Sequence, residues 1–529
     1  MPHRRSSPER PSVERIARAA RIVATLCLTV DVACTAPVSR QPGRPAGTVI
    51  VNARVLDGSG GPPRSVAVRI VGDRIVEVGA QPAARGDRVI DAAGLTLAPG
   101  FIDTHSHHDR GLREHRDALA VVSQGVTTIV VGQDGGSDIP LAEFFARLEQ
   151  TPPAANVASY VGHGTVRSTV MGDDFRRVAT PAEIRRMREI VETEMRAGAL
   201  GLSTGLEYDP GIYSSRDEVL DLARAVAPFG GRYISHVRSE DRAFWQAIDE
   251  LVAIGRDARI PVQISHVKLA MRSLWGQTDS LLRMLDRARA AGVDVTADVY
   301  PYTYWQSTLT VLFPERDFAN HATAELVLRE VAAPEGLLLS RFAPDTTYVG
   351  KTVADIARLR GTDPATTLMA LIRETQEAER AGRPSDESVI GTSMTEHDVA
   401  RLIAWPHANI CSDGELAGRH PRGFGAFPRV LGRYVREQGV IGLTEAVRKM
   451  TSLSAAHVGI VDRGRIAPGY FADLVLFDPA TILDRATPVE PRATAVGIRR
   501  VWVNGEVVYE GGTVTGRFPG RVVRRASAR

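Results

Sequence analysis

The chain has 529 residues, of which 43% are hydrophobic and 24% are charged, and this is enough to bury one large core with a smaller domain beside it. Its formal net charge of +3 is unevenly distributed, because residues 1–44 carry eight Arg and three acidic residues and residues 515–529 carry five Arg and no acidic residue. The acidic remainder has no basic stripe with interleaved aromatic residues, which argues against a nucleic-acid-binding surface on the folded body.

Residues 1–45 are predicted to be an export signal followed by a linker. Three Arg residues precede the apolar run IVATLCLTV (22–30), which is too short to span a bilayer by itself. The next residues, DVACTAP, resemble a bacterial lipoprotein cleavage site in which Cys34 is lipidated, and Asp31 departs from that pattern. We expect an exported protein, either periplasmic or lipid-anchored to a bacterial membrane. The alternative is a disordered basic leader on a cytoplasmic protein.

Two β-rich segments flank the long middle of the chain. In residues 46–98, TVIVNARVLDGSG and VAVRIVGDRIVEVG alternate apolar with polar residues and break at Gly-rich turns, as strands do. Residues 465–515 show the same alternation, with a hairpin signal at Asn504-Gly505. We expect these segments to form one small β-sandwich domain built from both chain ends, and residues 516–529 to be a basic tail.

The middle of the chain, residues 99–464, alternates strand and helix patterns. The predicted strands are GFIDTH and residues 127–132, 156–164, 200–205, 232–237, 261–268, 293–302 and 408–415. The helical patterns between them are residues 181–197, 215–228, 240–257 and 277–291. Eight βα units predict an α/β fold with a (β/α)8 TIM-type barrel. An insertion at about residues 310–400 separates the last two strands, and we expect it to cover the site.

Histidine and aspartate residues recur at the ends of these strands. The segment GFIDTHSHHDRG (100–111) ends the first strand, and His105 and His107 are two residues apart, so they face the same side. His236 ends the fifth strand, His266 the sixth and Asp413 the eighth. Each of these histidines alone is more simply a buried residue bonded to backbone. Together at the carboxyl ends of barrel strands they predict a Zn²⁺ site, because imidazole and carboxylate both bind this ion.

These residues resemble the amidohydrolase superfamily, and the match is closer to the N-acyl-D-amino-acid deacylase (D-aminoacylase) family. The resemblance runs from about residue 47 to 512 through the motifs PGFIDTHSHHD, GVTTIVVG, GLSTGLEYDPG, ISHVRSE, QISHVK, DVYPYT, SDGE, HPRGFGAFPRVLGRYV, KMTS and DRGRIAPGYFADLVLFDP. It implies a zinc-dependent amide hydrolase that deacylates N-acyl-D-amino acids or related N-blocked amino acids with a metal-activated water. It also implies one or two Zn²⁺ ions, with Asp413 as the catalytic acid and base.

The chain departs from this family at one ligand. The family usually has a cysteine after the second strand, in a turn that here reads GQDGG and places Asp134 at that position. Strand four ends in GLEYDPG, which puts Glu207 where other amidohydrolases have a bridging lysine carbamate or glutamate. We therefore predict that Glu207 bridges two metals. Asp134 is expected either to lie beside the metal ligands without binding the metal or to serve as an alternate ligand. An ordinary turn aspartate bonded to its own backbone is the other interpretation of Asp134.

The substrate is expected to be a small molecule with a free carboxylate. Lys268 lies two residues after His266 on the same strand face, and Arg422 lies in the HPRG loop beyond the eighth strand. The ammonium group of lysine and the guanidinium group of arginine can both bind a carboxylate. The resemblance assigns substrate contacts to Lys268, Tyr302, Ser307 and Arg422, with Tyr213 and Arg238 as further candidates. Each charged residue of this set could instead be a solvated or structural ion pair.

Two other functions remain open from the sequence. One is a cyclic-amide or dipeptide hydrolase of the same superfamily, such as a dihydroorotase or an isoaspartyl dipeptidase, which predicts turnover of cyclic imides or β-linked dipeptides. The other is a non-catalytic binding relative. Such a relative should have lost ligands or the acid and base, and this chain retains all of them.

Overall fold

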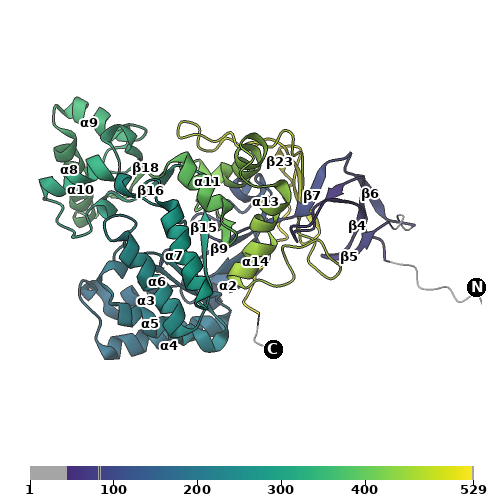
Figure 1. Cartoon of the computed structure of the whole chain (residues 1–529), viewed down its shortest axis with the longest axis horizontal. Coiled ribbons are helices and arrows are strands. Elements are labelled where there is room, and N and C mark those ends of the chain that lie inside the picture. Colours follow the sequence, from purple (N-terminus) through teal and green to yellow (C-terminus); the bar gives the residue numbers. More distant parts are fainter. Residues whose placement is uncertain (1–44, 81–82, 84, 527–529) are drawn as a thin grey trace, which may run out of the picture. The chain divides into compact units, whose positions relative to one another are not determined.

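The computed structural model of the chain describes residues 45–80, 83 and 85–526 (Figure 1). The predicted export signal and Cys34 lie outside the described residues. In the described part, the helices are too short or too polar for any of them to cross a membrane.

A ring of parallel strands lies at the centre of the fold. One parallel sheet is formed by β8 (Phe101–Asp103), β9 (Val126–Val131) and β10 (Asn156–Ser159). A second is formed by β11 (Val161–Gly162), β12 (Gly201–Gly205), β13 (Arg232–His236), β14 (Val262–Ile264), β15 (Val295–Val299) and β19 (Ala408–Ile410). Only Tyr160 separates β10 from β11. At the other seam the Asp413 N–H donates to the His105 carbonyl at 2.9 Å, so the ring closes. The predicted (β/α)8 barrel is confirmed.

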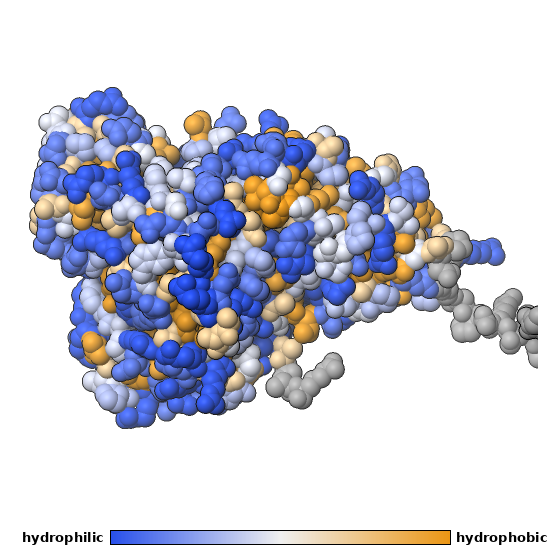
Figure 2. All heavy atoms as spheres, viewed as in Figure 1, coloured by the Kyte–Doolittle hydropathy of each residue, from blue (hydrophilic) through white to orange (hydrophobic). Residues whose placement is uncertain are grey.

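Helices cover the outside of the ring (Figure 1). They are α1 (Leu119–Val122), α2 (Leu141–Gln150), α3 (His163–Met171), α4 (Pro181–Ala197), α5 (Arg216–Val226), α6 (Phe244–Ala258), α7 (Thr278–Ala290), α11 (Glu396–Ala404), α12 (Arg422–Arg429), the π-helix η8 (Val430–Glu437), α13 (Leu443–Met450) and α14 (Ser452–Val458). Figure 2 shows a mostly hydrophilic outer face over these helices, as expected for amphipathic helices with one face against the strands.

Local signals set the bounds of the longest barrel helix, α4. The Thr180 side chain accepts from the Glu183 N–H while Glu183 caps Thr180 in return, and Pro181 occupies the first turn. Gly198 ends the helix at φ 112°, a conformation that a residue without Cβ adopts readily. These residues explain why the sequence pattern predicted the same range that the structure has.

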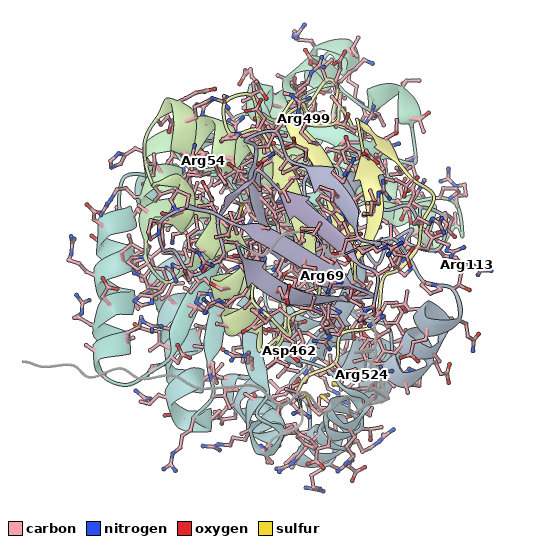
Figure 3. All side chains as sticks on the ribbon, turned by 90° about the vertical axis from the view of Figure 1, so that its right-hand side faces the viewer. Arg54, Arg69, Arg113, Asp462, Arg499 and Arg524 are labelled. Carbon is pink, nitrogen blue, oxygen red and sulfur yellow. The ribbon has the colours of Figure 1, made fainter. Side chains whose placement is uncertain are left out.

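Both chain ends build one β-sandwich. The first sheet contains β1 (Thr48–Val51), β4 (Ala67–Val71), β5 (Arg74–Gly79) and β6 (Arg88–Asp91). The second contains β2 (Arg54–Val55), β3 (Arg64–Ser65), β7 (Thr96–Pro99), β20 (Leu474–Phe477), β21 (Ile498–Val503), β22 (Glu506–Glu510) and β23 (Thr513–Val514). Figure 3 shows the purple N-terminal strands beside the yellow C-terminal ones. The link is the antiparallel pair of β7 with β20, in which Ala98 faces Val475.

The segment between β15 and β19 forms a small α/β unit with a hydrophobic core of its own. Its sheet has the order β16 (Tyr304–Ser307), β18 (Glu387–Thr392) and β17 (Leu338–Phe342), all antiparallel. Its helices are α8 (His321–Glu330), α9 (Val353–Arg360) and α10 (Pro364–Arg380). We call residues 304–392 the insertion, which begins slightly earlier than the predicted residue 310. Ion pairs connect it to loops of the barrel, with Arg316 on Asp209 at 2.9 Å and Arg341 on Glu415 at 3.4 Å.

The described part of the predicted basic tail is packed against the barrel. The Val157 N–H donates to the Arg521 carbonyl at 2.9 Å, and the Val523 N–H donates to the Val157 carbonyl at 2.8 Å. Further along, the Arg525 N–H donates to the Gly198 carbonyl at 3.1 Å. Residues 521–525 thus lie along the amino end of β10 and reach the turn that precedes β12.

Deleting residues 517–529 is expected to lower the free energy of unfolding by about 2 kcal/mol or more, because backbone groups of β10 lose their partners. Thermal unfolding followed by circular dichroism measures this. The control is Arg524→Gln, which removes the half-exposed ion pair with Glu149 and the contact of the guanidinium with the Phe145 ring and should cost about 1 kcal/mol. An unchanged melting temperature in the deletion variant would show that the packed tail contributes nothing to stability.

Candidate metal centre

The candidate ligands lie at the carboxyl ends of the barrel strands. His105 and His107 follow β8, His236 is the last residue of β13, and Asp134 lies in the turn after β9. Three of the candidates have left-handed backbones that are uncommon for residues with a side chain, with φ 52° at Asp134, 33° at His266 and 49° at Asp413. Strained backbone of this kind is typical of functional sites.

The first group of donor atoms contains two histidines and two aspartates. His105 Nε2 lies 3.4 Å from Asp134 Oδ1 and 3.6 Å from Asp413 Oδ1. His107 Nε2 lies 3.3 Å from Asp134 Oδ2 and 3.4 Å from Asp413 Oδ1. Donor atoms placed tetrahedrally about 2.0–2.1 Å from a zinc ion are about 3.3–3.4 Å apart. The spacing of these atoms therefore fits a zinc ion.

The second group shares one of these aspartates. Asp134 Oδ1 lies 3.4 Å from His266 Nε2, which in turn lies 3.1 Å from His236 Nδ1. The Asp134 carboxylate therefore stands between the two histidine pairs and reaches both of them. This arrangement can hold two metal ions that share Asp134 as a ligand.

The structure places both Glu207 and Asp134 in groups of side chains that could hold a metal ion, and the group of Glu207 also contains His236 and Glu240. Glu207 Oε2 accepts a hydrogen bond from His236 Nε2 at 2.9 Å, on the side of the ring opposite the Nδ1 that faces His266. The contacts of Glu207 thus reach one histidine of the site, His236, whereas those of Asp134 reach His105, His107 and His266. Carboxylates in this position fix the tautomer of a metal-binding imidazole.

The electrostatics of the site favour a cation among the ligands. Burial lowers the pKa of His107, but hydrogen bonds with Asp134 and Asp413 outweigh it and raise the pKa to about 9. Burial and Lys268 lower the pKa of His266, and the surrounding carboxylates raise it to about 10. The site thus stabilises positive charge where the donor atoms converge. A divalent metal ion supplies that charge and leaves the imidazoles neutral, as ligation requires.

Asp413 faces two different partners. Its Oδ1 points to the metal-site histidines, and its Oδ2 lies 2.6 Å from Nη1 of Arg422. Burial raises the pKa of Asp413, but Arg422 and the neighbouring histidines outweigh it, so the pKa lies below its ordinary value. Asp413 is therefore ionised and can accept a proton on Oδ1.

Two predicted substrate residues, Lys268 and Arg422, line the same cavity as the metal-site residues. Lys268 is buried, and its Nζ donates to Glu240 Oε1 at 2.7 Å and lies 2.7 Å from His266 Nδ1. Arg422 is also buried, and its guanidinium carbon lies 4.7 Å from the ring centroid of Tyr300. Their positive charges stand beside the metal site, where they can attract a carboxylate.

Tyr302 and Arg238 have partners away from the candidate ligands. The Tyr302 hydroxyl donates a hydrogen bond to Asp484 at 3.2 Å. Arg238 forms a bidentate ion pair with Glu250, with both hydrogen bonds at 2.8 Å. Neither side chain lines the cavity. Tyr300, two residues earlier, lies between Arg422 and Lys268, and its buried hydroxyl has no hydrogen-bond partner in the described part of the protein.

The other predicted contacts, Ser307 and Tyr213, line the cavity. Ser307 donates to the hydroxyl of Tyr208 at 3.4 Å, and the Tyr208 ring lies 4.4 Å from the ring of His236. Sequence reasoning missed Tyr208, although it directly follows Glu207 in the motif GLEYDPG. It also missed Asp298, whose Oδ1 accepts from the His266 N–H at 2.5 Å and orients that ligand.

One cavity of about 1320 Å³ is lined by five of the candidate ligands, namely His107, Asp134, His236, His266 and Asp413. Its volume exceeds the roughly 300–1,000 Å³ of most small-molecule pockets. Its inner end is lined by residues of the metal site, and its outer part is lined by residues of the insertion, among them Trp305, Leu312 and Glu387. The expected cover over the site is thus formed by the insertion.

Comparison with known proteins gives consistent matches over most of the chain. The amidohydrolase family model matches residues 88–334 and 329–509. The D-aminoacylase of Alcaligenes xylosoxydans xylosoxydans is 35% identical over 516 residues, which are 93% of this chain and 100% of that protein. The N-acyl-D-glutamate deacylase of the same organism is 37% identical over 501 residues, which are 90% of this chain and 96% of that protein.

A solved structure matches equally well. The N-acyl-D-glutamate deacylase of Bordetella bronchiseptica, in complex with zinc and a phosphonate inhibitor that mimics the tetrahedral intermediate of its reaction, has a TM-score of 0.81. It is 34% identical, and the match covers 91% of this chain and 100% of that one.

Proposed function

The chain belongs to the amidohydrolase family, and from this premise we propose that it hydrolyses the amide bond of N-acyl-D-amino acids. The observation that carries the proposal is the geometry around Asp134, which joins two histidine pairs next to the carboxylate of Asp413 and the cations of Lys268 and Arg422. Relatives of 35–37% identity over nine-tenths of the chain act on compounds of this class. The alternatives of a cyclic-amide hydrolase and a non-catalytic relative have no comparable support.

The metal would be held by six side chains that the structure brings together. They are His105, His107, Asp134, His236, His266 and Asp413. Zinc, when bound, lowers the pKa of water and polarises a carbonyl group, and both effects promote amide hydrolysis. Glu207 and Asp298 each hold one histidine in place by a hydrogen bond. Glu207 bonds to the imidazole of His236, and Asp298 bonds to the backbone N–H of His266.

Asp413 moves the proton of the reaction. Its Oδ1 faces the site and accepts a proton from the water that attacks the carbonyl carbon, and it then donates that proton to the amide nitrogen as the C–N bond breaks. Arg422 stabilises the ionised carboxylate through Oδ2. The products are a carboxylic acid and a free D-amino acid.

The positive side chains beside the site bind the substrate carboxylate. Arg422 offers a planar fork of N–H donors, and Lys268 contributes a buried charge. The ring of Tyr300 lies near both cations and helps to hold them in place. When the substrate carboxylate is bound by these side chains, the amide group of the substrate lies next to the metal site. The scissile carbonyl group is thereby positioned for attack.

Turnover of N-acetyl-D-leucine, N-acetyl-L-leucine and dihydroorotate by residues 35–529 tests the proposal. We expect hydrolysis of the D-compound, loss of activity after chelation, and recovery on adding zinc. The L-enantiomer should react at least about 100-fold more slowly, since a shifted reacting group costs about that factor. Turnover of dihydroorotate alone would instead support the cyclic-amide alternative.

We propose further that the protein is exported. It then either acts in the periplasm or is attached to the membrane by a lipid on Cys34. The support is the basic and apolar pattern of residues 15–30 and the cysteine that follows it. Labelling cells with a radioactive fatty acid distinguishes a lipid anchor, which Cys34→Ala should abolish, from simple export. Recovery of the full-length chain in the cytoplasm would contradict both.

A further inference from the structure

The outer part of the cavity contains a carboxylate that the proposed reaction does not use. This carboxylate belongs to Glu387, the first residue of β18 in the insertion. The only hydrogen bonds described for it come from one donor, the Leu309 N–H, at 2.8 Å to Oε1 and 2.9 Å to Oε2. A carboxylate has room for about four hydrogen bonds, so most of this capacity is unmet.

The charged neighbours of Glu387 are already engaged elsewhere. Two arginines of the insertion line the cavity, but Arg316 is paired with Asp209 and Arg341 with Glu415. Across the described residues, no ion pair to Glu387 is present. Burial raises the pKa of Glu387 to about 8, and no neighbouring cation opposes this effect. Burial favours the neutral form of this side chain, and a ligand ammonium group would favour its ionised form.

Glu387 lines the same cavity as the residues of the metal site. In the pairing of β16 with β18, Ser307 lies opposite Val389, and Glu387 is two residues further along the strand, about 7 Å away. Ser307 contacts Tyr208, whose ring packs on His236.

We propose that Glu387 binds an amino group of the substrate, and that this enzyme prefers N-acyl-D-amino acids that carry an amine on the part lying under the insertion. The inference rests on the proposed function and specifies its substrate class. The amine has two possible sources, the side chain of the D-amino acid or the acyl group. Both present the same ammonium to the same carboxylate, with hydrogen bonds assisted by charge.

The test compares kcat/KM within two matched pairs of substrates. The first pair is N-acetyl-D-lysine and N-acetyl-D-norleucine, and the second is N-(6-aminohexanoyl)-D-leucine and N-hexanoyl-D-leucine. We expect the amine to be preferred about tenfold or more in one pair, since a hydrogen bond to a charged group contributes about 1.5–3 kcal/mol. The pair that shows the preference identifies the source of the amine.

Two variants separate recognition from a structural role. Glu387→Gln keeps an acceptor for the Leu309 N–H, so it should leave the melting temperature and the turnover of the neutral substrate unchanged while abolishing the preference for the amine. The matched control is Glu379→Gln, an exposed carboxylate of α10 on the same cavity, which should keep the preference. Equal kcat/KM within both pairs, or a preference that persists in Glu387→Gln, would overturn the inference.

Failure of the proposed function has a different signature. In that case the neutral members of both pairs would not be hydrolysed either. Calorimetric titration of the wild type and Glu387→Gln with the same four compounds then decides the inference without turnover. Binding of an amine-bearing compound that weakens about tenfold in the variant supports it, and equal binding of all four compounds in both proteins overturns it.

Discussion

Replacing Asp413 with Asn is expected to reduce kcat for N-acyl-D-amino-acid hydrolysis by about 10³-fold, within the range that a positioned acid and base contributes. The amide has the shape of the carboxylate and retains an oxygen that can face His105 and His107, but it cannot accept the proton of the attacking water. Metal content should therefore change much less than kcat. Steady-state kinetics and metal analysis of the same sample measure the two effects.

The control for Asp413 is the next carboxylate of the motif SDGE. Glu415 lines the same cavity, but its carboxylate is paired with Arg110 at 3.0 Å and Arg341 at 3.4 Å and does not contact a ligand. Glu415→Gln should keep kcat within about threefold, since exposed pairs contribute little. If Asp413→Asn keeps full kcat, another group moves the proton and the mechanism is wrong.

Removing the carboxylate of Asp134 is expected to have the largest effect on metal binding. We expect about two metal ions per chain in the wild type and one or none in Asp134→Ala, because the two histidine pairs lose the ligand they share. Glu207→Gln should keep both ions and weaken their binding by about 10–100-fold, as for other residues that orient a ligand. Metal analysis after gel filtration, followed by titration with a chelator, distinguishes the two.

The substitution Asp134→Cys provides a matched rescue. The resemblance to N-acyl-D-amino-acid deacylases indicates that a cysteine usually occupies this position, and thiolate is a good zinc ligand. Asp134→Cys should therefore retain metal where Asp134→Ala loses it. Full metal content in Asp134→Ala together with loss of one ion in Glu207→Gln would support the bridging role of Glu207 that the sequence favoured.

The barrel could be predicted from the sequence because its signals are local. Strands such as β9 are buried on both faces and read as short runs of β-branched residues, and α4 has a capping residue, a proline and a terminal glycine at its ends. The histidine ligands could be predicted for the same reason, since each stands at the end of such a run. Their convergence then follows from the topology of the barrel.

Assignments that depend on the path of a turn were not predictable. Whether Asp134 or Glu207 stands between the histidines depends on where β9 and β12 end and on a left-handed residue at Asp134. Tyr300 and Tyr302 are two residues apart and would share a face in a regular strand. β15 ends at Val299, however, so strand alternation no longer applies, and only Tyr300 approaches Arg422.

The pairing of β7 with β20 has a consequence for how the chain folds. Ala98 meets Val475 across this pair, so the sandwich sheet requires two segments that are synthesised more than 370 residues apart. The first strands to leave the ribosome must wait for nearly the whole chain before their sheet is complete, and contacts of such long range slow folding. Premature assembly of the finished enzyme is thereby disfavoured.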